Sequence, residues 1–416
     1  MLFLLIELLQ NQFGTGVFSI LTYTSTRMIL AAATSLLLCI SLGPWMIKKL
    51  YELKIGQSIR MEECPLLGQL HFKKKDTPTM GGLLILTAML VSLLLFMDPR
   101  SPFTLILFCT TLVLGGLGAT DDYLKIRYKN TKGLPAKAKL AIQVGLSILL
   151  ALYLVWPAMS NSLQVGNWFI PPIVKEQPLV RLAVDTSYLG STEQWTTIQR
   201  TLSIQDVAAR IFMPFFRDPL ITFTGIGLIL AALLIIIVVT GSSNAVNLTD
   251  GLDGLAAGNL ILVASCLAIV AFFSNNIELA RYLNLLYIQG AGEIAIYLFA
   301  LCGACLGFLW YNGHPAQVFM GDTGSLALGG IIGVSAVLIG KVLFLALVGG
   351  IFVAEAVSVI LQVGSYKLRN KKRIFLCAPL HHHFEYKGWP ETKVVLRFWI
   401  IGLLLALGGL ASIKLG

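Results

Sequence analysis

Long runs of uncharged residues recur along the whole chain and restrict its fold more than any other feature. Runs of roughly 20 residues without Asp, Glu, Lys or Arg cover 28–47, 79–97, 101–120, 140–157, 220–240, 254–277, 294–311 and 323–340. Two further apolar runs, 342–363 and 394–413, carry one charge each, at Glu355 and Arg397. Each run can cross about 30 Å of hydrocarbon as an α-helix. The sequence therefore predicts an all-α polytopic membrane protein with about ten transmembrane helices.

The composition agrees with a membrane protein and excludes an ordinary soluble one. Of the 416 residues, 56% are hydrophobic and only 12% are charged, whereas soluble domains carry about twice that charged fraction. We expect one integral-membrane domain over residues 1–416, in contact with the lipid bilayer and without a nucleic-acid partner.

The uneven distribution of basic residues predicts the orientation. The segments 48–79, 121–139 and 364–393 hold 20 of the 31 lysine and arginine residues. With ten spans these segments fall on one side, which the positive-inside rule assigns to the cytoplasm. Both termini would then lie outside.

The longest segment on the outward side covers residues 158–219, and it is rich in Ser, Thr and Gln. We expect an enlarged extracytoplasmic insertion that forms a small hairpin, a helical cap or a flexible stretch. It could contact a partner or build a homodimer.

Acidic residues gather at the predicted cytoplasmic ends of the spans. Asp121 and Asp122 close the third span, and Asp322 precedes the eighth within Phe319-Met320-Gly321-Asp322-Thr323-Gly324-Ser325. Adjacent carboxylates at a membrane boundary are costly unless a cation bridges them. Each also has a simpler interpretation, since Asp121 could pair with Lys125 four residues on, and Asp322 could be a helix N-cap.

A second polar series separates two apolar runs. Asn244, Asn247, Asp250 and Asp253 recur every three residues, so neighbouring members share a helix face. A polar helix cap would explain Asp253 but not four such groups in a row.

Two basic or histidine-rich segments could contact phosphate groups. Lys73-Lys74-Lys75-Asp76-Thr77-Pro78-Thr79-Met80-Gly81-Gly82 combines cations, hydroxyls and a glycine pair, and His381-His382-His383 lies in the last cytoplasmic loop. The simpler interpretations are a basic flank of a span and a solvated loop. Together with the acids, these segments predict Mg²⁺-assisted phosphoryl transfer at the membrane surface, with a lipid phosphate as one substrate.

These motifs, in this order, resemble the phospho-N-acetylmuramoyl-pentapeptide-transferase family of the polyprenyl-phosphate N-acetylhexosamine-1-phosphate transferase superfamily. The segments that carry the resemblance are Thr77–Gly82, Asp121–Tyr123, Asn244–Gly254, Phe319–Ser325 and Pro379–Glu385. The resemblance implies transfer of phospho-MurNAc-pentapeptide from UDP-MurNAc-pentapeptide to undecaprenyl phosphate, giving lipid I and UMP. It also implies a Mg²⁺ cofactor and a bacterial cytoplasmic (inner) membrane location, with the active site facing the cytoplasm.

The resemblance also assigns roles to individual positions of this sequence. Asp121, Asp122, Asp322 and His381 match catalytic residues, and Asp322 matches the metal ligand. Substrate-binding positions match Lys74, Thr79, Lys125, Lys129, Lys137, Asn247, Asp250, Asp253, His382 and His383. Two departures stand out: Asp76 occupies a position where the family usually has glycine, and the segment 158–219 is longer than the usual loop.

The residues leave three questions open. A direct attack by the lipid phosphate and a double displacement through an aspartyl-phosphate both fit the aspartates. A sister enzyme that transfers GlcNAc-1-phosphate would share them, although the histidine motif and Thr77–Gly82 favour the muramoyl-pentapeptide enzyme. A secondary transporter, with Glu355 on its path, is the alternative from another class, but here the acids lie at span ends rather than near the midplane.

Overall fold

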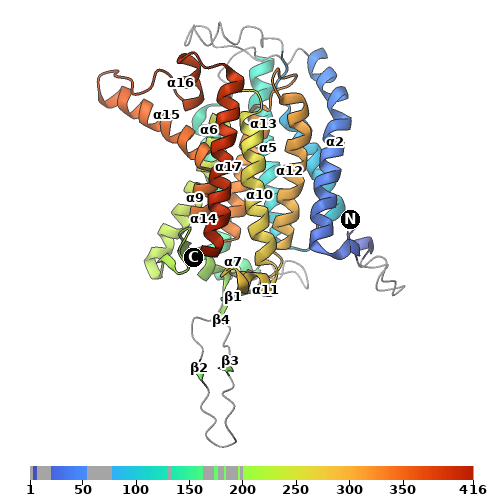
Figure 1. Cartoon of the computed structure of the whole chain (residues 1–416), viewed down its shortest axis with the longest axis vertical. Helices are drawn as coiled ribbons and strands as arrows, with labels where there is room; N and C mark the ends of the chain where they lie inside the picture. Colours follow the sequence, from blue (N-terminus) through green and yellow to red (C-terminus); the bar gives the residue numbers. More distant parts are fainter. Residues whose placement is uncertain are drawn as a thin grey trace, which may run out of the picture.

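The computed structural model describes residues 3–6, 20–53, 77–128, 133–162, 173–176, 182–183, 195–196 and 200–415. The long helices and their short connections form a bundle (Figure 1). The helices are α2 (Thr24–Glu52), α4 (Gly82–Phe96), α5 (Pro102–Arg127), α6 (Ala136–Val155), α7 (Pro157–Ser162), α8 (Ile204–Ala208), α9 (Leu228–Thr249), α10 (Leu255–Ser274), α11 (Ile277–Tyr282), α12 (Gly292–Asn312), α13 (Gly321–Leu338), α14 (Val342–Val348), α15 (Gly350–Leu368), α16 (Leu380–Tyr386) and α17 (Glu391–Leu415).

The apolar runs become helices, as the sequence predicts. Within the described residues, nine helices are long and apolar enough to cross a membrane, and α4 is a shorter apolar helix. The all-α polytopic fold is therefore confirmed. The sidedness of the termini stays a prediction.

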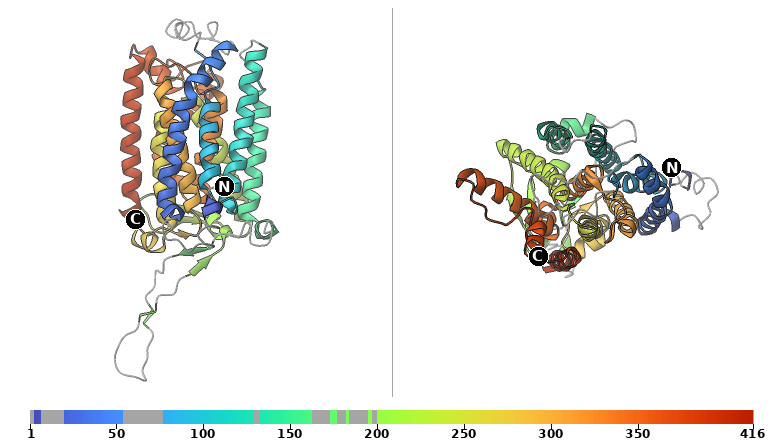
Figure 2. Two further views of the ribbon diagram at one scale, coloured as in Figure 1. Left: turned by 90° about the vertical axis from the view of Figure 1, so that its right-hand side faces the viewer. Right: turned by 90° about the horizontal axis from the view of Figure 1, so that it is seen from above.

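One predicted span differs from the structure. The run 342–363 does not form a single helix but divides at Gly349 into α14 and α15. The helix α14 packs against α17, while α15 leans away from the bundle, as Figure 1 and the top view of Figure 2 show. The chain changes direction here, because α14 packs mainly against α17 whereas α15 packs mainly against α9.

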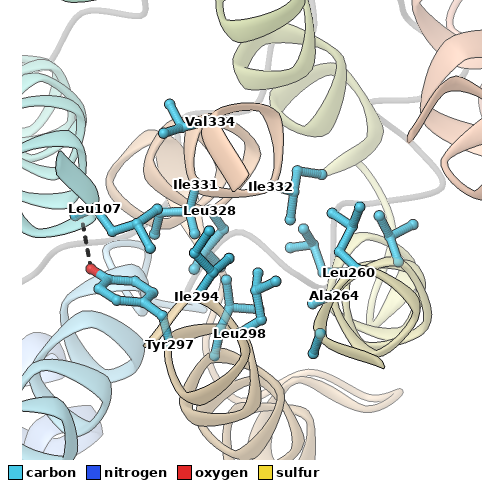
Figure 3. Close-up of a cluster of buried hydrophobic side chains, with 14 of the residues drawn as sticks. Leu107, Leu260, Ala264, Ile294, Tyr297, Leu298, Leu328, Ile331, Ile332 and Val334 are labelled. Carbon is cyan, nitrogen blue, oxygen red and sulfur yellow. Dashed lines mark hydrogen bonds between the residues drawn. The ribbon is translucent and has the colours of Figure 1, made fainter. Parts of the chain in front are cut away.

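The helices α12 and α13 form the centre of the bundle. In the most apolar 18-residue stretch of each helix, 78% of the residues of α12 and 89% of those of α13 are buried. The corresponding share is 22% for the span that contains α9, at the periphery. Ile294 and Leu298 of α12 face Leu328 and Ile331 of α13 in a cluster of apolar side chains (Figure 3). At its edge the Tyr297 hydroxyl donates to the Leu107 carbonyl of α5 at 3.2 Å and contacts the Thr111 hydroxyl, so this buried polar group is satisfied.

The two ends of the bundle differ in character. At one end, α5 and α9 finish while α13 and α17 begin, so the acidic motifs converge there (Figure 1). The opposite end carries the short strands β1 (Val174–Glu176), β2 (Leu182–Ala183), β3 (Trp195–Thr196), β4 (Arg200–Leu202), β5 (Arg210–Phe212), β6 (Pro219–Thr222) and β7 (Tyr287–Ile288).

The strands at the opposite end pair in small antiparallel units. Strand β1 pairs with β4 and β7, β2 with β3, and β5 with β6. The described parts of 158–219 thus include both expected kinds of structure, hairpins and short helices. The status of this segment as an insertion stays a prediction.

Candidate active site

Three carboxylates from two helices meet at one end of the bundle. Asp121 and Asp122 lie near the end of α5, and Asp322 lies in the first turn of α13. Each of the three offers an oxygen within 4.8 Å of the others. Asp121 and Asp122 are buried, whereas Asp322 is partly exposed. The structure therefore brings together acids that are 200 residues apart in the sequence.

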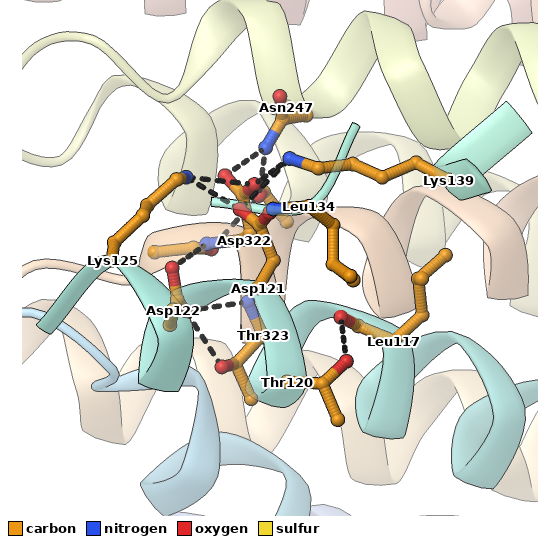
Figure 4. Close-up of polar contacts among 12 residues, drawn as sticks. Leu117, Thr120, Asp121, Asp122, Lys125, Leu134, Lys139, Asn247, Asp322 and Thr323 are labelled. Atoms are coloured by element: carbon orange, nitrogen blue, oxygen red, sulfur yellow. Dashed lines mark hydrogen bonds and ion pairs between the residues drawn. The ribbon is translucent and has the colours of Figure 1, made fainter. Parts of the chain in front are cut away.

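Two lysines contact both Asp121 and Asp322 and reach them from opposite sides (Figure 4). The Lys125 Nζ is 2.6 Å from Asp121 Oδ2 and 3.1 Å from Asp322 Oδ2. The Lys139 Nζ, which comes from α6, is 2.8 Å from each of the same two oxygens. The second oxygen of Asp121 accepts the Leu134 backbone N–H at 2.7 Å. Each ammonium group thus bridges both carboxylates.

Asp122 has a different set of partners. Its Oδ2 accepts the Thr323 backbone N–H at 2.9 Å and the Thr323 hydroxyl at 2.7 Å, and its Oδ1 accepts the Asp322 N–H at 3.2 Å. A carboxylate at a helix N-terminus satisfies free N–H groups and stabilises the helix dipole. Asp122 therefore fixes the first turn of α13 and the backbone that carries Asp322.

The turn before Asp322 requires a glycine. Gly321 has φ +72°, and a Cβ there would lie 2.7 Å from Asp122 Oδ2 and 2.8 Å from Thr79 Oγ1. Both the left-handed backbone and the lack of space exclude a side chain. The same measurement places Thr79, a predicted substrate-binding residue, directly beside the acids.

The polar series at the end of α9 divides in two. Asn247 donates to Asp322 Oδ1 and to Ser325 Oγ, both at 2.8 Å, and so joins the acid cluster. Asp250 caps the helix and is half-buried. Burial first, and then the nearby charges of Asp322 and Asp122, raise the pKa of Asp250 to about 8. A substantial fraction of Asp250 is therefore protonated at neutral pH.

Asp253, the last member of the series, points to different elements. Its Oδ2 lies 3.0 Å from His314 Nδ1 and accepts the Ala316 N–H at 3.1 Å. Its own N–H donates to Glu391 Oε1 at 2.8 Å. Asp253, His314 and Glu391 form a second group whose ligand atoms lie within 4.8 Å of one another. The three-residue spacing no longer places side chains on one helix face after Asp250, because α9 ends at Thr249.

The histidines of the 381–383 motif lie on α16 and have separate surroundings. His381 is buried, with Nδ1 3.2 Å from Glu355 Oε1, and its backbone N–H donates to the same oxygen. A Cβ on Gly251 would come within 2.3 Å of His381 Nε2, so the ring faces the Asp250–Gly254 turn. Glu355, the single acid within its predicted span, thus holds α16 against α15.

The other two histidines contact residues of their own loop. His382 Nδ1 lies 2.7 Å from Glu385 Oε2, and His383 Nδ1 accepts the Leu376 N–H at 3.1 Å. Their predicted substrate-binding roles stay predictions. So do those of Lys137, which is exposed on α6, and of Lys74 and Lys129, which lie outside the described residues.

The sequence reasoning missed Lys139 as a site residue. A signal was available, because Lys139, Gln143 and Ser147 recur every four residues along a mostly apolar helix. Gln143 accepts from Asn244 at 2.9 Å and donates to Ser243 at 3.0 Å, so this face of α6 lies against α9. The sequence reasoning also missed His314 and Glu391, for which spacing gave no signal.

The carboxylate cluster fits a hard divalent cation. Its donors are all oxygens, which Mg²⁺ prefers, and the buried Asp121 Oδ2 has no hydrogen bond within the described residues, only the two ammonium contacts. Asp121, Asp122 and Asp322 are the residues that could hold such an ion.

Comparisons with known proteins identify the family of the chain. The model of the family Glycosyl transferase family 4 matches residues 192–340. The model of phospho-N-acetylmuramoyl-pentapeptide-transferase signature 1 matches residues 74–86. The chain is 60% identical over 414 residues to the phospho-N-acetylmuramoyl-pentapeptide-transferase of Protochlamydia amoebophila. It is 45% identical over 417 residues to the enzyme of that name from Francisella tularensis subsp. tularensis. Both alignments cover 100% of each protein. The chain therefore belongs to the phospho-N-acetylmuramoyl-pentapeptide-transferase family.

Proposed function

We propose that this chain transfers phospho-MurNAc-pentapeptide from UDP-MurNAc-pentapeptide to undecaprenyl phosphate, giving lipid I and UMP. The observation that carries the proposal is the cluster of Asp121, Asp122 and Asp322 with two bridging lysines at one end of membrane-spanning helices. A lipid phosphate can reach a site at a bilayer edge while a nucleotide arrives from water. We place this edge at the cytoplasmic face of the bacterial inner membrane, since the basic residues of α5, α6 and the α15–α16 connection, which the structure describes, lie at this end.

The reaction exchanges one phosphorus–oxygen bond for another. An oxygen of the lipid phosphate attacks the phosphorus that carries the sugar, and the bond from this phosphorus to UMP breaks, so UMP leaves with the electron pair. Negative charge therefore gathers on phosphate oxygens, where Lys125 and Lys139 supply two ammonium groups.

The contacts separate the roles of the two neighbouring aspartates. Both oxygens of Asp122 are engaged by the first turn of α13, whereas Asp121 Oδ2 faces the lysines. We therefore assign positioning of Asp322 to Asp122, and orientation or deprotonation of the lipid phosphate to Asp121.

A bound Mg²⁺ would be held by Asp322, and it would supply positive charge to the phosphate oxygens. Asn247 donates to Asp322 Oδ1 and fixes the orientation of this carboxylate. Substituting Asp322 should therefore disturb both metal dependence and turnover.

The test is UMP release by the purified full chain with UDP-MurNAc-pentapeptide and undecaprenyl phosphate across a Mg²⁺ titration. Asp322→Asn should lower kcat at least about 100-fold, the loss typical of removing a charge-stabilising group. Glu278→Gln, which removes an exposed acid on α11, should leave turnover unchanged. Normal Mg²⁺-dependent turnover by Asp322→Asn would contradict the metal assignment, and release of UMP only from a UDP-GlcNAc donor would contradict the proposed substrate.

A further inference from the structure

The end of the bundle opposite the acids carries a hollow between the β5–β6 hairpin and the helix ends. Asp322 lies in the first turn of α13 and Lys341 follows its last residues. Eighteen helical residues rise about 27 Å, close to the thickness of the hydrocarbon core. The hollow therefore lies at the other membrane surface. The space that the centre of a water molecule could occupy is about 30 Å³, within about 410 Å³ that includes the open mouth, and the lining includes Phe212, Met213, Phe216, Arg217, Lys341 and Phe344.

The hairpin beside the hollow presents apolar side chains outward. Phe216, Leu220 and Ile221 are 64%, 58% and 44% exposed. The chain then continues through Ile226, which is 86% exposed, into α9, whose outer face is also apolar. Such a continuous apolar surface is unfavourable in water and favourable at a lipid interface. The hairpin therefore lies where lipid head groups meet acyl chains.

Lys341 brings a positive charge into the hollow without an acidic partner. Its Nζ lies 5.3 Å from the centroid of the Phe212 ring, and within the described part of the chain it forms no salt bridge. Burial lowers the pKa of Lys341 to about 8. Since the described residues give Lys341 a ring contact but no acidic partner, an anion in the hollow would compensate its charge.

Arg217 provides a second cation on the lining. It comes from the tip of the hairpin and is exposed, as is its neighbour Asp218, which is not part of the lining. The hollow thus combines two cations, aromatic walls and an apolar rim. A ligand with an anionic head and an apolar tail could contact the cations with its head and the rim with its tail. A small soluble anion would use the cations but not the rim.

We propose that the hollow binds the phosphate-bearing head group of an anionic phospholipid in the leaflet opposite the active site, with Lys341 and Arg217 as its contacts. The exposed hairpin side chains, Phe216 foremost, lie among the upper acyl carbons. The β5–β6 hairpin thereby gains a function as a lipid-binding anchor, separate from phosphoryl transfer.

The test measures lipid binding to the full chain in detergent by native mass spectrometry. Phosphatidylglycerol should bind at least about tenfold more tightly than phosphatidylcholine, since a charge-assisted contact gives roughly that factor. Lys341→Gln and Arg217→Gln should each reduce this preference, while Lys341→Arg should retain it. Arg281→Gln removes an exposed cation at the same end of the bundle but outside the lining and should have no effect.

Several outcomes would overturn the proposal. Equal binding of the two lipids, or equal losses in Arg217→Gln and Arg281→Gln, would show a nonspecific basic surface. If inorganic phosphate at equal concentration displaced phosphatidylglycerol completely, the site would bind a free anion instead. Because Arg217 is exposed, its variant should fold even if Lys341→Gln does not. UMP release by Arg217→Gln should match the parent chain, so failure here is distinct from failure of the proposed function.

Discussion

Lys125 and Lys139 each contact both Asp121 and Asp322, so two positive charges are held between two carboxylates. This arrangement keeps the carboxylates close together in the absence of substrate. It also places the ammonium groups where phosphate oxygens would enter. The same four side chains can thus serve the stability of the site and the binding of an anionic substrate.

Removing Lys139 should weaken catalysis more than folding. We expect Lys139→Gln to lower kcat/KM for UMP release by roughly 10- to 100-fold, since one charge-assisted contact to phosphate is lost. Lys139→Arg should recover part of this loss. Lys49→Gln removes an exposed lysine at the end of α2 and should have no effect. Wild-type kinetics for Lys139→Gln would show that Lys139 does not contact substrate.

Asp250 predicts a pH dependence of stability. Its pKa is raised from 3.8 to about 8 in the folded protein, so the folded state binds the proton more tightly than the unfolded state. The protonated carboxyl contributes its full stability below about pH 4, and this contribution is lost as the pH rises through 8. In Mg²⁺-free buffer the apparent Tm of the parent chain should therefore fall from pH 5 to pH 8 more than that of Asp250→Asn. Parallel Tm profiles would contradict this assignment.

At the scale of elements, the end of α12 opposite the acids is joined to α2 and α4 by one buried ion pair. Arg27 Nη1 lies 2.8 Å from Glu293 Oε1, and Arg27 Nη2 donates to Glu293 Oε2 at 2.9 Å. Arg27 Nε also donates to the Phe96 carbonyl at 2.7 Å, and Glu293 accepts the Asp98 N–H at 2.9 Å. All the strong polar groups at this junction are therefore paired, which allows them to be buried.

Breaking this pair on one side should be costly. Arg27→Met leaves the Glu293 charge buried without its partner, and we expect a loss of about 3 kcal/mol or more in stability. The double variant Arg27→Met with Glu293→Gln should recover part of that loss. Thermal unfolding in detergent would measure both. A single variant as stable as the parent chain would mean that the ion pair contributes nothing.

The break between α14 and α15 also belongs to this scale. It separates a short helix that packs with α17 and β5 from a long helix that leans outward and carries Glu355. Through Glu355, α15 contacts the backbone and ring of His381. The break therefore sets the direction of α15, and with it the position of Glu355 and of the His381 that Glu355 contacts.

At the scale of the whole molecule, the two ends of the bundle have different tasks. One end gathers carboxylates, lysines and the histidine helix, while the other carries the strands and the basic hollow. The helices between them are long enough to separate the two by a bilayer. The orientation of the molecule in the membrane follows as a testable statement.

A cysteine introduced at Lys137 should lie on the cytoplasmic side, and one introduced at Arg281 on the outer side. Both positions are exposed. In intact cells that produce the chain, a membrane-impermeant maleimide should label the Arg281→Cys variant but label the Lys137→Cys variant only after lysis. The parent chain controls for native thiols. The reverse labelling pattern would show that the positive-inside assignment is wrong.

The sequence alone identified the membrane-spanning helices and the residue types of the site. Each span needs about 20 consecutive apolar residues, because backbone groups within lipid must be satisfied inside the same helix. This requirement is local, so it can be read from consecutive residues. The apolar runs therefore predicted the spanning helices. They did not predict that the run 342–363 divides into α14 and α15, because this division depends on the helices that α14 and α15 pack against.

Only the tertiary structure decided which polar groups meet. Spacing grouped Asp250 with Asp253, but the end of α9 sends Asp253 to His314 and Glu391. Spacing also gave no reason to group Lys139 with Asp121. The two side chains meet because α6 packs beside α5 and α9. Contacts between helices depend on the rotation and tilt of each axis, and these are set by the packing of side chains from distant parts of the chain. The sequence therefore determined the spans and the chemistry available, and the packing determined the active site.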